Sequence, residues 1–229
     1  MTPVSTDGID DMIGRYDRRN RWWYRAFRPP LPLISNPSEA MLPAGITGRR
    51  LLVGGAGAGH HPGWIVIDLA RHPGVTVLCS VEALPFRADA FAAIECDAVL
   101  EHVAAPRPAI EQMERVLAPG GHLHVVVPFN HPFHEYPADY QRWTVDGLRR
   151  FLGRFEVLDA GVRTGPTATL LTFVLEYVKL CAPRPLRKPA YAAVGWLVWP
   201  FRYLDIWLNR RPDAHVLANS IYALVRKPR

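Results

Sequence analysis

The sequence has few cysteines, and they form no pattern. Cys79, Cys96 and Cys181 are the three present, an odd number, and no two of them have the C-x-x-C spacing. Neither a disulfide framework nor a zinc site is therefore predicted. A reducing cytoplasm is the simplest compartment for such a chain.

The sequence also lacks a secretory signal and a long apolar run. Its N-terminus, MTPVSTDGIDDMIG, has acidic residues where a signal peptide has a basic segment followed by an apolar one. No stretch reaches the roughly 20 uninterrupted apolar residues of a membrane-spanning helix. We expect a cytoplasmic protein.

Most of the net positive charge lies in the C-terminal third. The net charge is +6, and residues 163–229 alone carry 11 basic and 3 acidic side chains. This distribution predicts that the C-terminal end meets an anionic surface, and it argues against a nucleic-acid groove across the whole molecule.

Short apolar runs predict most of the strands. They occupy residues 50–54, 64–69, 75–79, 91–96, 122–128, 155–162 and 220–228. Near-continuous apolar runs of this length are typical of parallel strands that are buried on both sides. The fold class predicted is α/β, a Rossmann-like, mostly parallel sheet of about seven strands with helices on both faces.

Helix signals lie between these runs. In residues 108–121, Ile110, Met113, Val116 and Leu117 share one helical face, and Pro119 with two glycines ends the pattern. Thr144 is placed to cap a second helix over residues 145–152.

The composition suggests three parts. Residues 1–48 are a basic and aromatic helix (15–28) followed by a proline-rich connector. Residues 49–162 and 215–229 form the α/β core, and residues 163–214 form an apolar, basic helical insertion before the last strand.

A glycine-rich loop follows the first predicted strand in "LLVGGAGAGHH". The dinucleotide fingerprint fails because His60 stands where its third glycine belongs, and a P-loop fails because no Lys-Ser or Lys-Thr pair follows. What remains is glycine at 55, 57 and 59, with Asp68 ending the next strand. A carboxylate there can accept hydrogen bonds from both ribose hydroxyls of an adenosine, while the glycines let the backbone approach the rest of the ligand.

At this point the chain resembles the class I S-adenosylmethionine-dependent methyltransferases of the type-11-like group. The segments "VGGAGAG", "IDL", "VEALPF", "VLEHV" and "RVLAPGGHLHVVVP" appear in the family's order over residues 51–128. The continuation "PFNHPFHEYPADYQRWTVDGLRRFL" is similar to a subset linked to cell-envelope glycan or lipid modification.

The resemblance implies S-adenosyl-L-methionine as the cofactor and places it on named residues. Gly55, Gly57 and Gly59 would wrap its methionine end and Asp68 would hold the ribose. Further along the same edge, the adenine would lie beside Ser80, Val81 and Glu82, and Cys96 would lie beside the methyl donor.

Two other functions stay open. Val53, Ser80 and Ala92 stand where family members usually carry acids, which leaves room for a non-catalytic binding or scaffold protein on a degenerate methyltransferase fold. A different nucleotide enzyme, such as a dehydrogenase, is disfavoured by the failed fingerprint.

The densest polar stretch is "HPFHEYPADYQRW", residues 131–143, which we call the polar loop. It follows a strand directly, where open α/β sheets bind ligands. We expect His134 or His131 to be the general base for a hydroxyl acceptor and Asp139 to orient it. The predicted substrate contacts are His102, Tyr136, Tyr140 and Arg142. The spacing within the loop matches no standard ligand pattern, so no metal is predicted.

The insertion is apolar and basic without being able to span a bilayer. Its longest uncharged run, residues 190–201, contains Pro200 and precedes Arg202. Such a segment either lies in a membrane interface or covers the acceptor site. We expect peripheral binding to the inner face of the membrane, with Trp196, Trp199, Tyr203 and Trp207 at headgroup depth. The basic residues expected to face anionic lipid are Arg184, Arg187, Lys188, Arg210 and Arg211. The acceptor expected there is a glycan, a lipid-linked molecule or a hydrophobic small molecule.

Overall fold

The computed structural model describes residues 29–55 and 61–229. Its centre is a seven-stranded sheet of order β3-β2-β1-β4-β5-β7-β6. The strands are β1 (Arg50–Val53), β2 (Trp64–Asp68), β3 (Val77–Leu78), β4 (Phe91–Asp97), β5 (Leu117–Pro128), β6 (Glu156–Thr164) and β7 (Ser220–Arg226). The pairs among β1 to β5 are parallel, and β7 runs antiparallel between β5 and β6. The predicted mostly parallel α/β sheet is confirmed.

Helices connect the later strands and fill the long segment before β7. They are the short 3-10 turn η1 (Leu100–His102), α3 (Pro106–Val116), α4 (Val145–Phe151), α5 (Pro166–Cys181), η2 (Arg184–Leu186), α6 (Arg187–Val198), η3 (Trp199–Leu204), α7 (Asp205–Leu208) and η4 (Ala214–Leu217). The predicted cap of α4 is confirmed, because the Thr144 side chain accepts a hydrogen bond from the Gly147 N–H.

Two local predictions were wrong. Leu117 does not end the helix: its backbone is extended and pairs with Phe91, so β5 begins there. The predicted strand over residues 75–79 is reduced to Val77 and Leu78, which pair with the last two residues of β2.

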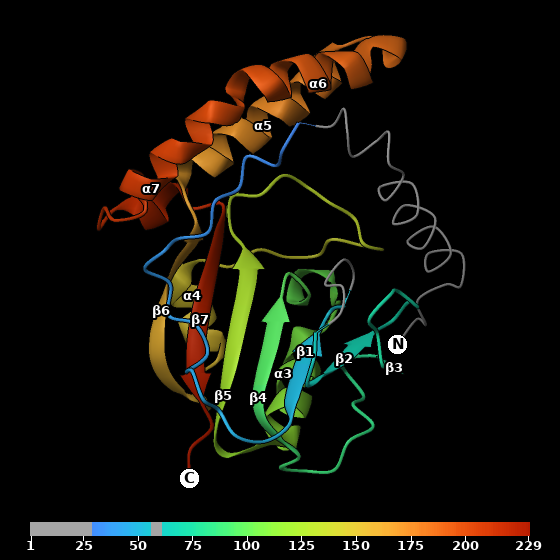
Figure 1. Ribbon diagram of the computed structural model, residues 1–229, viewed down its shortest axis with the longest axis vertical. Helices are drawn as coiled ribbons and strands as arrows, with labels where there is room; N and C mark the ends of the chain where they lie inside the picture. The colour runs from blue at the N-terminus through green and yellow to red at the C-terminus, as the bar shows by residue number, and fades with distance from the viewer. Residues whose placement is uncertain (1–28, 56–60) are drawn as a thin grey trace.

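One face of the sheet carries the main apolar core. Alternate residues of β1, β4 and β5 lie buried against α3 and α4, which lie behind the strands in Figure 1. The helix contributes Ile110 and Met113, as its periodicity predicts, and both are fully buried. Burial of these side chains is the main stabilising contribution to the sheet.

An extended segment, residues 29–48, crosses the opposite face of the sheet (Figure 1). We call it the strap. The Asn36 N–H donates to the Arg163 carbonyl at 2.8 Å, and the Ala40 N–H donates to the Tyr222 hydroxyl at 3.1 Å. Buried Glu39 pairs with the Arg163 guanidinium and lies 3.0 Å from His124 Nε2. The strap is thereby fixed to β6, β7 and β5.

Residues 166–217 form a separate helical layer beyond the carboxyl ends of β4 and β5 (Figure 1). Its first helix is held by Asp205 of α7, which is fully buried and accepts hydrogen bonds from the N–H groups of Thr167 and Ala168. These two donors lie in the first turn of α5, where backbone N–H groups have no partner within the helix. None of the helices in the described ranges has the length and apolarity needed to cross a bilayer.

Candidate active site

The glycine turn begins where β1 and β2 end side by side. The N–H groups of Gly54 and Gly55 both donate to the Ile67 carbonyl, at 3.0 and 3.2 Å. A side chain on Gly55 would put its Cβ 2.7 Å from Val66 Cγ1, so the protein's own packing requires glycine there. Gly57 and Gly59 lie outside the described residues, so their predicted contacts stay predictions.

Asp68 lies at the end of β2, next to this turn. Its Oδ1 accepts a hydrogen bond from the Ala70 N–H at 3.0 Å, which orients the carboxylate. Among the described residues no other hydrogen bond engages this side chain. Its second oxygen is therefore able to accept hydrogen bonds from a ligand, as a ribose site requires.

The segment after β3 lies beside Asp68. The Cys79 N–H donates to the Asp68 carbonyl at 3.1 Å, and the Ser80 hydroxyl accepts from the Glu82 N–H at 3.2 Å. Val81 is buried in the main core. The side chain of Ser80 thus closes a local turn, in the place where family members usually carry an acid.

Cys96 is the next-to-last residue of β4, and its side chain lies in the core. Its thiol is fully buried, and burial raises the pKa well above the usual value, with a smaller effect from the nearby carboxylate of Glu101. The side chain is therefore a packing group, and the predicted place of Cys96 beside the methyl donor stays a prediction.

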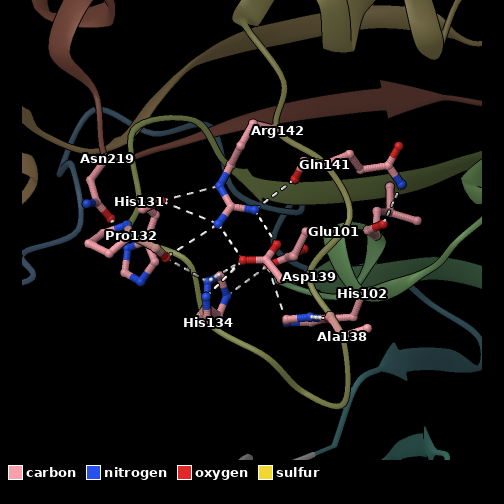
Figure 2. A network of polar contacts seen from close by, with 11 residues as sticks. Glu101, His102, His131, Pro132, His134, Ala138, Asp139, Gln141, Arg142 and Asn219 are labelled. Carbon is pink, nitrogen blue, oxygen red and sulfur yellow. Dashed lines mark hydrogen bonds and ion pairs between the residues drawn. The ribbon is translucent and has the colours of Figure 1, made fainter. Parts of the chain in front are cut away.

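The polar loop is anchored on the turn that follows β4 (Figure 2). The Tyr140 N–H donates to the Glu101 carbonyl at 2.8 Å. The Gln141 side chain donates to the carbonyls of Leu100 and Val103 at 3.1 and 2.9 Å. Two segments about 40 residues apart in sequence are therefore fixed against each other at the carboxyl edge of the sheet.

Asp139 and Arg142 form an ion pair inside the polar loop. Arg142 also donates to the His131 carbonyl, and Asp139 accepts the backbone N–H of His134 at 2.9 Å. Burial alone would raise the pKa of Asp139, but the hydrogen bonds from Arg142 and the His134 backbone lower it to about 2. The pair therefore fixes the shape of the loop. The Asp139 carboxylate makes a second, longer contact with His134 Nδ1, at 3.5 Å.

The rings of three histidines, His102, His134 and His131, form a row next to the Leu100–His102 turn. The ring centroids of His102 and His134 are 5.0 Å apart, and those of His134 and His131 are 4.7 Å apart. The carboxylate of Glu101, which is fully buried, lies beneath two of them: its Oε1 is 3.6 Å from His134 Nε2 and 3.8 Å from His102 Nε2. Sequence reasoning selected the histidines but not Glu101, although it directly precedes His102.

His131 has a defined tautomer. Its Nδ1 is 2.9 Å from Asn219 Oδ1. The Asn219 amide nitrogen donates to the Asn130 carbonyl and the Thr172 hydroxyl, so its oxygen is the acceptor for His131. Nδ1 of His131 therefore carries the proton and Nε2 is the basic atom. Burial lowers the pKa of this imidazole, which favours its neutral form.

Tyr136 connects the polar loop with the segment that follows β2. Its hydroxyl is 3.3 Å from Nε2 of His72, a buried residue four positions after Asp68. The polar loop thereby reaches the β2 side of the sheet. The side chain of Tyr140 is largely exposed instead.

The comparisons agree with this geometry. Residues 65–125 match a family model described as a methyltransferase domain. The chain has the class I methyltransferase fold. No curated protein matches it in sequence.

Solved structures resemble the chain over most of its length. The 1,6-didemethyltoxoflavin-N1-methyltransferase of Burkholderia thailandensis, solved with S-adenosylhomocysteine, has a TM-score of 0.54 at 16% identity, covering 100% of this chain and 93% of that one. The complex of a Haloferax volcanii methyltransferase activator with a candidate methyltransferase has a TM-score of 0.53 at 13% identity, covering 99% and 100%. A candidate sarcosine dimethylglycine methyltransferase from Galdieria sulphuraria has a TM-score of 0.51 at 11% identity, covering 79% and 78%.

Class I methyltransferases use S-adenosylmethionine as the methyl donor. The described residues fit this cofactor at one point above all, the Asp68 carboxylate, which is oriented through one oxygen and leaves the other for a ribose. In the described part of the turn, Gly54 adopts a φ of +87°, a backbone conformation that favours glycine.

Proposed function

We propose that this protein transfers a methyl group from S-adenosylmethionine to an acceptor bound between the polar loop and the helical layer. The observation that carries the proposal is the arrangement at the carboxyl edge: the oriented Asp68 carboxylate on one side, the row of histidines on the other, and Tyr136 joining them. Ligands of open parallel sheets bind at this edge.

The chemistry asks little of the protein beyond positioning. Methyl transfer from a sulfonium is an in-line displacement on an already activated carbon, so holding donor and acceptor in line supplies much of the rate enhancement. The Asp68 carboxylate would fix the ribose of the donor. The polar loop, held by the Asp139–Arg142 pair, would fix the acceptor.

If the acceptor is a hydroxyl, its proton has to leave. We assign His131 as the general base, because its Nδ1 is held by Asn219 and its basic atom is Nε2. Asn219, the residue before β7, takes the orienting role that the sequence assigned to Asp139. Neutral imidazole is suited to accept a proton near pH 7.

Replacing His131 with alanine should lower turnover by roughly 100-fold or more, the range for losing a general base. The affinity for S-adenosylhomocysteine should stay within twofold, because His131 lies on the acceptor side. Transfer of labelled methyl from S-adenosylmethionine into a panel of glycan, lipid-linked and small-molecule acceptors, together with calorimetry, measures both quantities.

Two other variants make this test specific. His131→Gln keeps a polar group of similar size without the base and should be as slow as alanine, whereas Asn219→Ala should lose turnover because the tautomer is no longer fixed. A His131→Ala protein that turns over normally would remove the residue from the chemistry.

The acceptor class is proposed from the helical layer. Leu197 is 73% exposed and Trp207 is 60% exposed, and Trp196 and Phe201 are also exposed. Trp199 is half-buried and packs against Trp196 and Tyr203, so it supports the others. The basic residues expected to face lipid, Arg184, Arg187, Lys188, Arg210 and Arg211, are all exposed. Apolar side chains beside basic ones suit an anionic bilayer surface, where a lipid-linked acceptor resides.

Co-sedimentation with vesicles tests this location. The protein should bind vesicles that contain anionic lipid, and binding should weaken as salt is raised because each basic residue near the surface contributes about 1 kcal/mol. Replacing Trp196, Leu197 and Trp207 with serine should abolish most of the binding. The matched control replaces Met41 and Leu158, which are exposed apolar residues of the strap and β6, and should bind normally. A protein that stays in the supernatant at low salt would leave the layer as a cover for the acceptor only.

A further inference from the structure

Glu101 is a buried carboxylate that receives no hydrogen bond from the described part of the chain. The side chain has no exposed surface, and among residues 29–55 and 61–229 neither Oε1 nor Oε2 has a hydrogen-bond partner. Removing an ionised carboxylate from water without a partner costs several kcal/mol or more, so such a group needs a positive charge nearby. The groups that face it are the Nε2 atoms of His102 and His134.

Both imidazoles present a lone pair to that carboxylate when they are neutral. His102 Nδ1 is 2.5 Å from the Ala138 carbonyl, which can only accept, so Nδ1 carries the proton. His134 Nδ1 is 3.2 Å from the Pro132 carbonyl and 3.5 Å from Asp139 Oδ2, and both of these oxygens are acceptors. The hydrogen-bonding pattern therefore leaves Nε2 of each ring unprotonated, directed toward the buried oxygen (Figure 2).

We propose that Glu101 Oε1, His102 Nε2 and His134 Nε2 bind one divalent transition-metal ion. The three ligand atoms lie within 4.8 Å of one another, and the two distances from the carboxylate, 3.6 and 3.8 Å, approach the roughly 3.4 Å between ligands of a tetrahedral ion. Two imidazole nitrogens and one carboxylate oxygen suit zinc, cobalt or iron rather than magnesium or calcium.

The surroundings have two further features of a metal site. Each imidazole is held at its other nitrogen by a backbone carbonyl, with the Asp139 carboxylate as an additional contact for His134, and such outer contacts fix the orientation of metal-binding histidines. The Tyr140 and Gln141 contacts fix the loop to the Leu100–His102 turn, so the ligands come from two segments that are already joined. His134 is about one-third exposed, which leaves an open side for water or an acceptor oxygen.

This inference rests on the cluster and not on methyl transfer. If the proposed function also holds, the open position faces the acceptor side, and an acceptor oxygen bound there would lose its proton more readily. The spacing within the polar loop shows no metal pattern, because two of the proposed ligands, Glu101 and His102, come from the turn after β4.

Metal titration of the full chain, without a histidine tag and after treatment with a chelator, tests the site. Cobalt should bind with 1:1 stoichiometry and give the visible absorption of a low-coordinate ion, and zinc should displace it. His134→Ala should weaken cobalt binding at least 100-fold, and Glu101→Gln should do the same if the variant folds by circular dichroism. His122→Ala, near the middle of β5, is the matched control and should bind as the parent does.

The results that overturn the proposal are distinct. A folded parent that binds no cobalt at pH 8 would mean that the cluster holds a proton instead of a metal. Equal losses in His134→Ala and His122→Ala would mean unspecific binding. S-adenosylhomocysteine titrations on the same metal-free samples separate this outcome from failure of the methyltransferase proposal, since the Asp68 side does not include the cluster.

Discussion

Asp68→Asn is expected to weaken the binding of S-adenosylhomocysteine by roughly 1.5 to 3 kcal/mol, about 10- to 150-fold, the range for losing hydrogen bonds to a charged group. Asparagine keeps the oxygen that accepts from the Ala70 N–H, so the turn after β2 should be retained. It replaces the second carboxylate oxygen by an amide donor, which cannot accept from a ribose hydroxyl. Isothermal calorimetry measures the change.

The matched control for this variant is Asp89→Asn. Asp89 is a half-exposed carboxylate paired with Lys227, and its φ of 56° is one that asparagine tolerates. The affinity of the Asp89→Asn protein for S-adenosylhomocysteine should equal that of the parent. If the folded Asp68→Asn protein binds as tightly as the control, the ribose is held elsewhere and the assignment of Asp68 is wrong.

Asp205→Ala is expected to lower the free energy of unfolding by about 3 kcal/mol or more. The change leaves the N–H groups of Thr167 and Ala168 buried without an acceptor, at roughly 1 to 3 kcal/mol each. It also removes a negative charge from the N-terminus of α5, where the helix dipole favours one. Urea denaturation followed by circular dichroism measures the loss.

Asp213→Ala is the corresponding surface change. Asp213 is exposed and pairs loosely with Arg211, so its loss should alter stability by less than about 0.5 kcal/mol. Equal stabilities of the two variants would mean that the contact of Asp205 with the first turn of α5 does not stabilise the helical layer. A selective loss for Asp205→Ala would also provide a protein in which the layer is loosened while the sheet is kept.

Much of the sheet could be predicted from sequence because its central strands are largely buried. The apolar runs that became β1, β2, β4 and β5 have few solvent-facing positions to interrupt them. Leu117 was assigned to a helix because its spacing from Met113 is helical, and only pairing with Phe91 places it in a strand. The role of the strap depends on Glu39 meeting Arg163 and His124, three residues whose sequence distances carry no signal.

Single residues of the candidate site could be predicted from sequence, but the contacts between distant segments could not. Asp68 ends a strand after a glycine loop, a local pattern that sequence can show. The contact between Glu101 and His134 depends on how the polar loop lies on the turn after β4. The Asn219 contact with His131 depends on β7 inserting beside β5. The ion pair of Asp139 with Arg142 depends on the geometry of the loop, so the sequence could not show that Arg142, and not a histidine, is the main partner of Asp139.

If the carboxyl edge of this sheet binds S-adenosylmethionine, calorimetry on the full chain should detect the product S-adenosylhomocysteine as a ligand. Titrated in parallel with NAD and ATP, S-adenosylhomocysteine should bind 1:1 in the micromolar range and the other two should not bind. Absence of binding by all three would mean that the edge is no cofactor site and would favour a scaffold on this fold. Binding of NAD or ATP alone would identify a different nucleotide enzyme.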